Sequence, residues 1–346
     1  MRLVTQTGLL CHPNVLDKTR YRVLDTTETA MMPSSIPTRS HAMRHCAPPL
    51  AAFVLAVMGG ACSVQRTGVD ILGNALSGGG GVFMSDEDPE LVREAIPFGL
   101  KTYESLLAVS PDHRGLLTSA AGGFIGYAYI LGQDADMREA TDIAGARALR
   151  ARASRLFLRG RDFALRGLEA SHPGFRETFA KDRTGALAMT DKGDVVLLYW
   201  AGAGWASALA NRKGDTQLIA DLPAAGALVA RILELDETYD FGSAHDFMIN
   251  YEGGRPGGST QAARAHYQRA LELSHGERAS VHLALAESVA LREQNAAEFH
   301  ELIRAALAVD PDRAPQMRLA NTLAIRRAQW LEKRQPLLFV SAEIRE

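Results

Sequence analysis

Cysteine is nearly missing from this sequence. The 346 residues include three, Cys11, Cys46 and Cys62, and none follows Cys62. A disulfide framework in the rest of the chain is therefore excluded, and so is a zinc site built on paired cysteines.

An excess of one charge, long apolar runs and strand-like alternation are also lacking. The formal net charge is −2, and no basic patch suggests nucleic acid as a partner. No run reaches the ~18–20 apolar residues that span a bilayer. The glycine run LSGGGGVF (76–83) is not followed by Gly-Lys-Ser/Thr, and His-Glu-x-x-His does not occur. We therefore predict no cofactor and no metal site.

The most hydrophobic stretch is MRHCAPPLAAFVLAVMGGAC (43–62). A short basic start, an apolar core over 48–58 and the small residues Gly59-Gly60-Ala61 before Cys62 resemble a bacterial lipoprotein signal, although Gly59 departs from the usual leucine. This predicts lipidation of Cys62. Ser63 favours the outer membrane, with the inner membrane as the alternative. The other reading of the stretch is a buried core helix.

These signals divide the chain into five parts. Residues 1–42 are interpreted as a disordered extension or as translation from a start codon upstream of Met43. The other expected parts are a signal peptide (43–61), a glycine-rich tether (62–85), a helical domain (86–335) and a C-terminal tail (336–346).

Helix signals dominate from Asp86 onward. In DEDPELVREAIPFGLKTYESLLAVSPDH (86–113), Asp88 is a predicted N-cap with Pro89 at the first helical position. Pro97 is expected to bend this helix. One apolar face is predicted at Leu91, Ala95, Phe98, Thr102 and Leu106. VVLLY (195–199) is the one candidate strand, and its neighbours fit a buried helix better.

One spacing of small and apolar residues recurs five times. It matches the second-helix signature of a tetratricopeptide repeat, in which a small residue lets paired helices approach and proline often ends the helix. The matches are Gly99–Tyr103–Leu106–Pro111, Gly160–Ala164–Leu168–Pro173, Ala224–Leu228–Ile232–Glu237, Ala263–Tyr267–Ala270–His275 and Phe299–Ile303–Ala306–Pro311. We predict an all-α fold of divergent tetratricopeptide-like repeats, an α-solenoid with long insertions and with Trp330 and Leu331 covering its last repeat. A generic helical bundle is the alternative.

Three segments carry candidate binding residues. They are GGFIGYAYILGQ (122–133), the apolar helix DVVLLYWAGAGWASALANRKGD (194–215) and GSAHDFMINYEGGRPGGS (242–259). Two tryptophans five residues apart cannot share one helix face, so one is expected to line a cavity while the other packs, unless both lie in the core. A histidine next to an aspartate leaves a hydrolase built on His245 and Asp246 open, although no serine elbow accompanies them. The candidates for ligand or partner contact are Tyr127, Trp200, Trp205, His245, Tyr251, Glu252 and Arg255.

Six segments in order resemble the TRAP-transporter-associated T component family. They are PFGLKTYESLLAVSPDHRGLL, RDFALRGLEASHPGF, LLYWAGAGWASAL, DLPAAGALVARILELDETYDFGSAHDFMINYEGGRPGGS, ARAHYQRALELS and AEFHELIRAALAVDPD, within residues 86–330. The resemblance implies a periplasmic, membrane-tethered helical lipoprotein and no enzyme. It would work with a TRAP solute-binding protein and a small hydrophobic or carboxylated solute. A protein–protein scaffold without a small ligand is the alternative, and homo-oligomerisation stays open.

Overall fold

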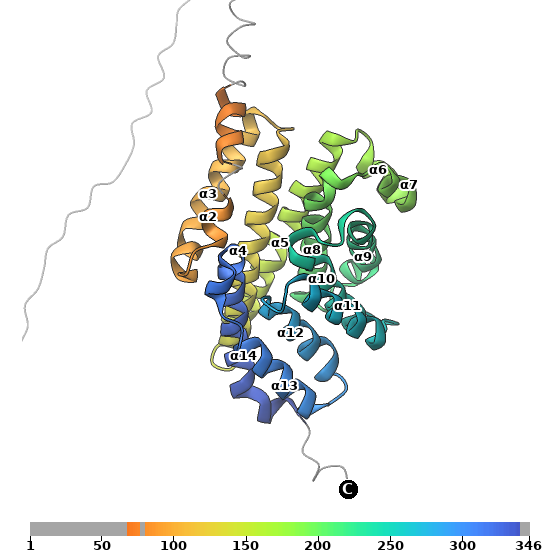
Figure 1. Cartoon of the computed structure of the whole chain (residues 1–346). Coiled ribbons are helices and arrows are strands. Elements are labelled where there is room, and N and C mark those ends of the chain that lie inside the picture. The colour runs from red at the N-terminus through yellow and green to blue at the C-terminus, as the bar shows by residue number, and fades with distance from the viewer. Residues whose placement is uncertain (1–67, 77–79, 340–346) are drawn as a thin grey trace, which may run out of the picture. The chain divides into compact units, whose positions relative to one another are not determined.

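The computed structural model describes residues 68–76 and 80–339, which all lie in the second of two units of the chain, 52–346. Within these residues the chain forms helices and turns and no strand, so the predicted all-α class is confirmed. The predictions for residues 1–61 and for Cys62 lie outside the described part. The main helices (Figure 1) are α2 (Gly80–Met84), α3 (Pro89–Val109), α4 (Arg114–Arg138), α5 (Ile143–Ser171), α6 (Phe175–Lys181), α7 (Arg183–Ala188), α8 (Val195–Ala210), α9 (Thr216–Asp236), α10 (Ser243–Gly254), α11 (Thr260–Leu273), α12 (Ala279–Leu285), α13 (Ala296–Leu307) and α14 (Arg318–Leu338).

Side-chain caps fix where many of these helices begin. Asp88 accepts hydrogen bonds from the backbone N–H groups of Glu90 and Leu91, and Pro89 is the first helical residue, as predicted. The other N-cap side chains that accept such bonds include Asp142, Asp182, Asp215, Ser259 and Asn295. Each cap satisfies a backbone donor that the helix itself leaves without a partner.

Helices that follow one another in sequence pack side by side. The contacts run from α3 to α4, α5, α8 and α9, and then from α10 through α11, α12 and α13 to α14. The last helix returns to the first ones, because α14 also contacts α2, α3 and α4 (Figure 1). Arg326 of α14 bonds to Glu90 of α3, and Arg327 bonds to Asp136 of α4 at 2.9 Å.

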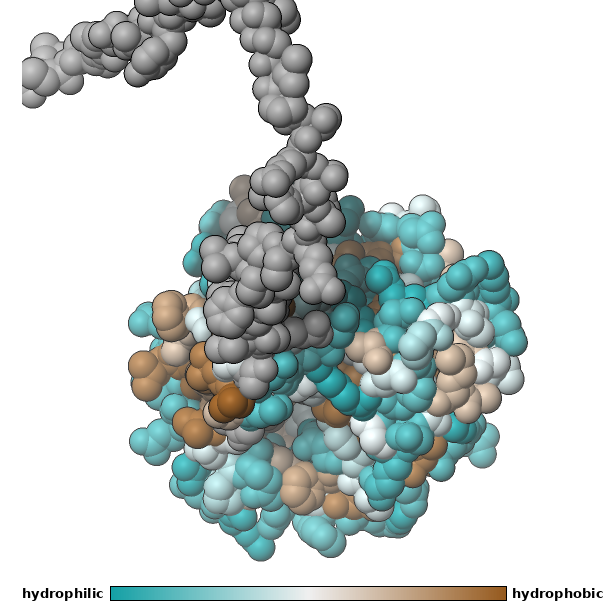
Figure 2. Space-filling view, turned by 90° about the horizontal axis from the view of Figure 1, so that it is seen from above, coloured by the Kyte–Doolittle hydropathy of each residue, from teal (hydrophilic) through white to brown (hydrophobic). Residues whose placement is uncertain are grey.

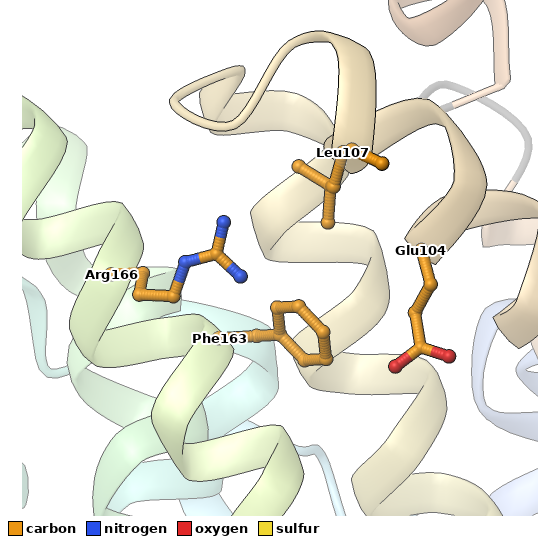
Figure 3. A pocket seen from close by; sticks show the side chains of 5 residues that line it. Glu104, Leu107, Phe163 and Arg166 are labelled. Atoms are coloured by element: carbon orange, nitrogen blue, oxygen red, sulfur yellow. The ribbon is translucent and has the colours of Figure 1, made fainter.

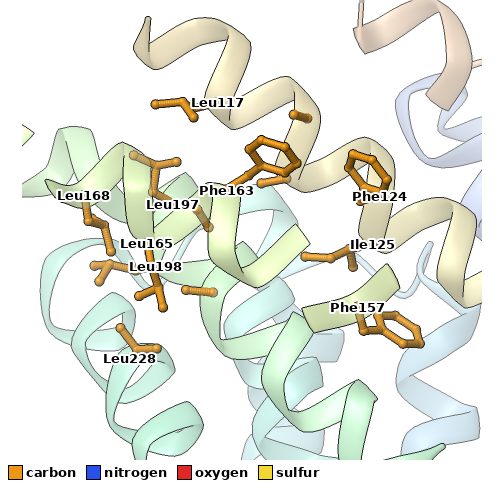
Figure 4. Packing of buried hydrophobic residues seen from close by; sticks show 14 of the residues in the cluster. Leu117, Phe124, Ile125, Phe157, Phe163, Leu165, Leu168, Leu197, Leu198 and Leu228 are labelled. Atoms are coloured by element: carbon orange, nitrogen blue, oxygen red, sulfur yellow. The ribbon is translucent and has the colours of Figure 1, made fainter. Parts of the chain in front are cut away.

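The apolar core has two large clusters and one small one. The larger cluster joins α3, α4, α5, α8 and α9, with Leu117, Phe124, Phe157 and Leu197 among its buried members (Figure 4). A second cluster joins α10 to α14. The small cluster includes Val92, Ile130 and Leu323, which come from α3, α4 and α14. Apolar burial therefore reinforces the contact between the two ends of the helical chain.

The five repeat-like matches fall on five different helices: α3, α5, α9, α11 and α13. Leu168, Ile232, Ala270 and Ala306, each from a different match, are fully buried. On α3 the match is weaker, since Leu106 is only partly buried. The spacing therefore locates core-facing helices correctly.

The apolar face predicted for α3 is wrong by one position. Leu91 and Phe98 are 58% and 80% exposed, whereas Val92 and Leu100 are buried. The helix carries two adjacent apolar rows, and the periodicity alone does not say which row faces the core. Val82 and Met84 of α2 are also exposed, and Figure 2 shows hydrophobic residues scattered over the surface of the molecule among hydrophilic ones.

Part of the segment expected to be a glycine-rich tether is helical. Residues 68–76 form a helix, and α2 follows over 80–84. Asp70 accepts a 2.6 Å hydrogen bond from Ser110, and a Cβ on Gly73 would lie 3.0 Å from Leu116. Glycine here permits close packing on α4 rather than flexibility.

One described helix, α4, is long and apolar enough to cross a membrane by length and composition. Its apolar side chains, however, pack against α5 and α8 in the larger core cluster. We therefore interpret α4 as a core helix.

Candidate functional site

The described part of the chain has two shallow surface hollows, and several of the side chains that line them bond to other residues of the chain. The first, about 220 Å³, lies between α3 and α5 and is lined by Glu104, Leu107, Phe163 and Arg166 (Figure 3). Glu104 is already paired with Arg159, and Arg166 bonds to a backbone carbonyl. The second lies between α11 and α13 beside a similar ion pair. Each hollow nevertheless keeps one charged group without an ion-pair partner among the described residues, Arg166 in the first and Glu301 in the second.

A more unusual site begins on one face of α4. Gly122, Gly126, Tyr129 and Gln133 lie at i, i+4, i+7 and i+11, so they share that face. A Cβ on Gly122 would lie 3.1 Å from the Trp200 ring. A Cβ on Gly126 would meet no heavy atom of the described residues within 4 Å, so this part of the helix borders open space.

Gln133 is the strongest sign that this face serves more than packing. Its side chain is 5% exposed, and neither its amide nitrogen nor its amide oxygen has a hydrogen-bond partner among the described residues. Buried polar groups are nearly always paired, since an unpaired one loses its hydration without compensation. The nearest polar neighbour of the amide is the Tyr129 hydroxyl, which lies beyond ordinary hydrogen-bond geometry but close enough for the amide to lower the pKa of the phenol.

Aromatic side chains face this surface from α8 and from the turn before α10. The Tyr199 ring centroid lies 5.1 Å from that of Trp200 and 5.7 Å from that of Tyr239. Burial raises the pKa of Tyr199 well above its usual range, and the nearby carboxylates of Asp240 and Asp246 raise it further. These phenols therefore stay neutral and act as hydrogen-bonding, apolar walls.

Two acidic residues complete the site. Ser280 of α12 donates a 2.5 Å hydrogen bond to the Asp246 carboxylate on α10. Arg278, itself 7% exposed, donates to the backbone oxygen and to the carboxylate of Asp240. Burial raises the pKa of Asp246, and Arg278 and Ser280 partly oppose this shift.

The backbone that carries Asp240 is strained. Asp240, Phe241 and Gly242 all have positive φ angles, 44°, 55° and 82°. Two non-glycine residues in the left-handed region raise the free energy of the loop by about 1–3 kcal/mol each, so the surroundings must hold them there. Here the hydrogen bonds from Arg278 hold the loop. Such strain is often found at functional sites.

Because Gly126 borders open space and Tyr129 is accessible, we infer a recess between helices here and call it the inter-helix recess. We assign to it Gly126, Tyr129 and Gln133 of α4, Tyr199 and Trp200 of α8, Tyr239, Asp246 and Ser280. Tyr129 keeps 40% of its surface accessible, yet burial raises the pKa of its phenol. A side chain that is both accessible and desolvated has protein around it on most sides, as in a narrow opening. The charge of Asp246 on α10 also raises the pKa of the Tyr129 phenol on α4.

An ion-pair network joins α4, α5 and α14 near Tyr129. Arg327 of α14 bonds to Glu287 at 2.5–2.6 Å and to Asp136 at 2.9 Å. Asp136 is shared with Arg150 of α5, which also pairs with Glu139. Although burial of Arg327 works against its charge, the attraction of Glu287 and Asp136 raises the pKa of its guanidinium above the ordinary value.

His245 does not face the recess, although Asp246 beside it does. Its Nδ1 lies 2.9 Å from Nδ1 of His266, and its Nε2 lies 3.3 Å from the Glu237 carboxylate. Burial lowers the pKa of both imidazoles. No hydrogen bond joins either ring to a serine hydroxyl among the described residues, so this geometry gives no support to the hydrolase alternative.

The histidine pair predicts loss of stability in mild acid. A histidine whose pKa falls on folding is protonated first in the unfolded chain, so its stabilising contribution is complete above pH ~6.5 and declines as the pH falls below it. We expect the melting temperature of the native protein to drop more between pH 7.5 and pH 5.5 than that of His266→Gln. Thermal denaturation followed by circular dichroism measures both; an equal or larger drop in the variant contradicts this prediction.

Tyr251, Glu252 and Arg255 form a structural corner. Arg255 pairs with Glu252 at 2.8 Å and lies 5.1 Å from the Tyr251 ring centroid. Glu252 also accepts a hydrogen bond from the Ser259 backbone, which fastens the loop between α10 and α11. The Tyr251 ring packs onto Gly226, where a Cβ would lie 2.3 Å from it. The ion pair and the hydrogen bonds of this corner therefore join residues of the chain to one another.

The remaining candidates are separated from one another. Trp200 lies at the recess. Trp205 does not, and the guanidinium of Arg161 lies over its indole ring, 4.7 Å from the ring centroid. Tyr127 is 8% exposed and bonds to Arg152 on another face of α4. Of the seven predicted contact residues, the structure thus places Trp200 at the recess and distributes the others elsewhere.

Sequence reasoning missed most of the recess. Tyr199, Tyr239 and the neighbours Arg278 and Ser280 belong to three separate segments, and nothing in the spacing of these segments links them. The glycines before Tyr129 were one available signal, because Gly126 leaves space beside the helix and Gly122 lets the Trp200 ring pack closely on it. Within the residues that the structure describes, no group of three or more His, Cys, Asp or Glu side chains is placed to hold a metal ion.

Comparison with known proteins agrees with the resemblance seen in the sequence. The model of the TRAP transporter T-component family matches residues 85–339. An uncharacterized protein of Treponema pallidum (strain Nichols) is 30% identical over 259 residues, which cover 72% of this chain and 80% of that protein. The chain belongs to the TRAP transporter T-component family.

Proposed function

We propose that the chain is a periplasmic, lipid-anchored accessory protein that docks a TRAP solute-binding protein and holds a small solute in the inter-helix recess. Membership of the family makes it an accessory component of a TRAP transporter. The tetratricopeptide-like spacing on α3, α5, α9, α11 and α13 supports a repeat architecture of the kind that presents binding surfaces. The signal-like segment that ends at Cys62 supports the anchor.

One observation carries the solute-binding part of this proposal. The recess combines a 5% exposed Gln133 without hydrogen-bond partners, open space at Gly126 and aromatic walls. Ligand sites are mostly apolar concavities with a few placed polar groups.

The docking part is tested by mixing the detergent-purified full chain with the TRAP solute-binding protein of the same organism. We expect native mass spectrometry to show a complex of defined stoichiometry. A mixture that stays unassociated with both the loaded and the empty solute-binding protein would overturn docking.

The solute part is tested by following the solute that co-purifies with the solute-binding protein. We expect part of it to appear as added mass on the chain. Gly126→Leu places a side chain in the recess and should abolish the added mass. Gly254→Leu is the matched control, because Gly254 also has no heavy atom within 4 Å but is exposed at the end of α10. Equal transfer to both variants would place the solute elsewhere.

A further inference from the structure

Arginines are concentrated on one face of α5. The helix contains seven arginines, two acidic residues and no lysine. Arg152, Arg155, Arg159 and Arg166 lie at i, i+3, i+7 and i+14, so they form one row about 21 Å long, which we call the arginine ridge. We propose that the arginine ridge docks an acidic surface of a partner protein. This rests on the proposed function and gives the surface and the chemistry of docking to the solute-binding protein.

The arginine ridge has little negative charge of its own. Only one of its arginines, Arg159, forms an ion pair among the described residues, with Glu104 of α3. Glu104 also pairs with Lys101, so this one carboxylate is shared between two cations. The formal net charge of the whole chain is −2, so the ridge does not simply reflect a basic protein. A surface of one sign attracts a partner of the opposite sign.

Two carboxylates of α5 lie within about one helical turn of Arg166 but bond elsewhere. Asp162 comes four residues before Arg166 and accepts hydrogen bonds from Arg161. Glu169 comes three residues after it and accepts two backbone N–H groups at the start of α6. Carboxylates at these spacings can pair with an arginine on a helix surface. Arg166 therefore keeps guanidinium donors for an external carboxylate.

Three of the ridge arginines are held over buried aromatic rings. The distances from the guanidinium carbon to the ring centroid are 5.5 Å for Arg152 and Tyr127, 4.8 Å for Arg159 and Phe124, and 5.3 Å for Arg166 and Phe163. Arg152 also donates to the Tyr127 hydroxyl, and Arg166 donates to the Pro111 backbone oxygen. An arginine that is held in this way loses less conformational freedom on binding, and its planar guanidinium matches a carboxylate.

The hollow between α3 and α5 lies at one end of the arginine ridge. Figure 3 shows the Arg166 guanidinium extending from α5 towards Leu107, with the Phe163 ring beside it. The hollow therefore combines apolar walls with a guanidinium that has no ion-pair partner in the described part of the chain. An apolar side chain of the partner can enter it next to the carboxylates that the arginines bind.

The surroundings of the ridge favour a protein over an anionic lipid surface. Helices that lie on membranes insert apolar side chains beside their basic residues. The rings next to the ridge are covered instead, since Phe124 is 3% and Phe163 is 7% exposed. Arg152, Arg159 and Arg166 also repeat about every 10 Å, a spacing that carboxylates fixed on a protein surface can match.

Charge reversal on the ridge tests this inference. Binding of the detergent-purified full chain to the TRAP solute-binding protein of the same organism is measured by isothermal titration calorimetry. We expect Arg155→Glu and Arg166→Glu each to raise Kd about tenfold or more, because like charges then face each other. Arg147→Glu is the matched control, since Arg147 is exposed on another face of α5, and it should change Kd by less than about threefold. Circular dichroism verifies that each variant keeps its helix content.

A pair of peptides tests the ridge without the solute-binding protein. Two fluorescein-labelled helical peptides of one composition carry their glutamates either on a single face or distributed around the helix. Fluorescence anisotropy should show that the native full chain binds the one-faced peptide about threefold or more tightly, and Arg155→Glu should abolish this preference. Equal binding of the two peptides to the native chain would overturn the ridge as a site for acidic proteins.

The outcomes separate the ridge from docking itself. A complex with the solute-binding protein that the ridge variants leave unchanged would overturn the inference while docking stood. Preference for the one-faced peptide without any such complex would overturn docking while the ridge stood. Binding of short-chain phosphatidylglycerol that Arg155→Glu abolishes, with both protein probes unaffected, would assign the ridge to lipid and overturn the inference.

Discussion

Replacement of Arg327 by methionine is expected to lower the free energy of unfolding by about 3 kcal/mol, because it leaves two partly buried carboxylates without their cation. Arg327 is the shared partner of Glu287 and Asp136, and the three side chains are 17%, 28% and 28% exposed. Methionine keeps most of the volume of the side chain and removes its charge and its hydrogen-bond donors. Urea denaturation followed by circular dichroism measures the difference.

The neighbouring residue provides a matched control. Arg326 pairs with Glu90 at the surface, where the two side chains are 41% and 48% exposed. Arg326→Met is therefore expected to lower stability by less than about 1 kcal/mol. In the Arg327→Met background, Glu287→Gln and Asp136→Asn should together recover part of the loss. Equal losses for Arg326→Met and Arg327→Met would mean that the network does not stabilise the contact between α14 and α4.

Local sequence signals predicted the helices well. Asp88 caps α3 as expected, and VVLLY begins α8 rather than a strand. The small residues of the repeat-like matches mark helices that approach closely; a Cβ on Gly160, for example, would lie 2.6 Å from Ile125. Capping and helical periodicity act within a few residues, so one sequence is enough to detect them.

The face of α3 and the recess depend on contacts between distant segments. Phe98 is exposed and Leu100 is buried because α4 packs on one of two apolar rows, and the sequence of α3 fits both choices. Asp246 was considered only as a partner of His245. Adjacent helical residues point about 100° apart, and the two side chains meet different helices.

The recess also depends on both halves of the helical chain. Its aromatic wall comes from α8 and its glycine face from α4, whereas Asp246 and Ser280 belong to α10 and α12. The return of α14 brings Arg327 near Tyr129. Disruption of that contact should therefore alter the recess as well as lower stability. Because Arg327 also packs on Trp330, the test uses the background Trp205→Phe/Trp330→Phe, in which the fluorescence of Trp200 and the unfolding curve should change together in Arg327→Met.

Two glycines on neighbouring helices should respond oppositely to larger side chains. A Cβ on Gly160 of α5 would lie 2.6 Å from Ile125 and 2.9 Å from the Ala121 backbone oxygen, which cannot move aside. We expect Gly160→Leu to lower the free energy of unfolding by about 2–3 kcal/mol, because overpacking outweighs the helix propensity gained. Thermal and urea denaturation both measure this loss.

Gly126 of α4 is the comparison. Its Cβ position meets no heavy atom of the described residues within 4 Å, so Gly126→Ala adds helix propensity without a clash. We expect it to raise the free energy of unfolding by about 0.5–1 kcal/mol. A loss at Gly126 as large as that at Gly160 would show that the face of α4 is packed against protein. The open space from which the solute site is inferred would then not exist.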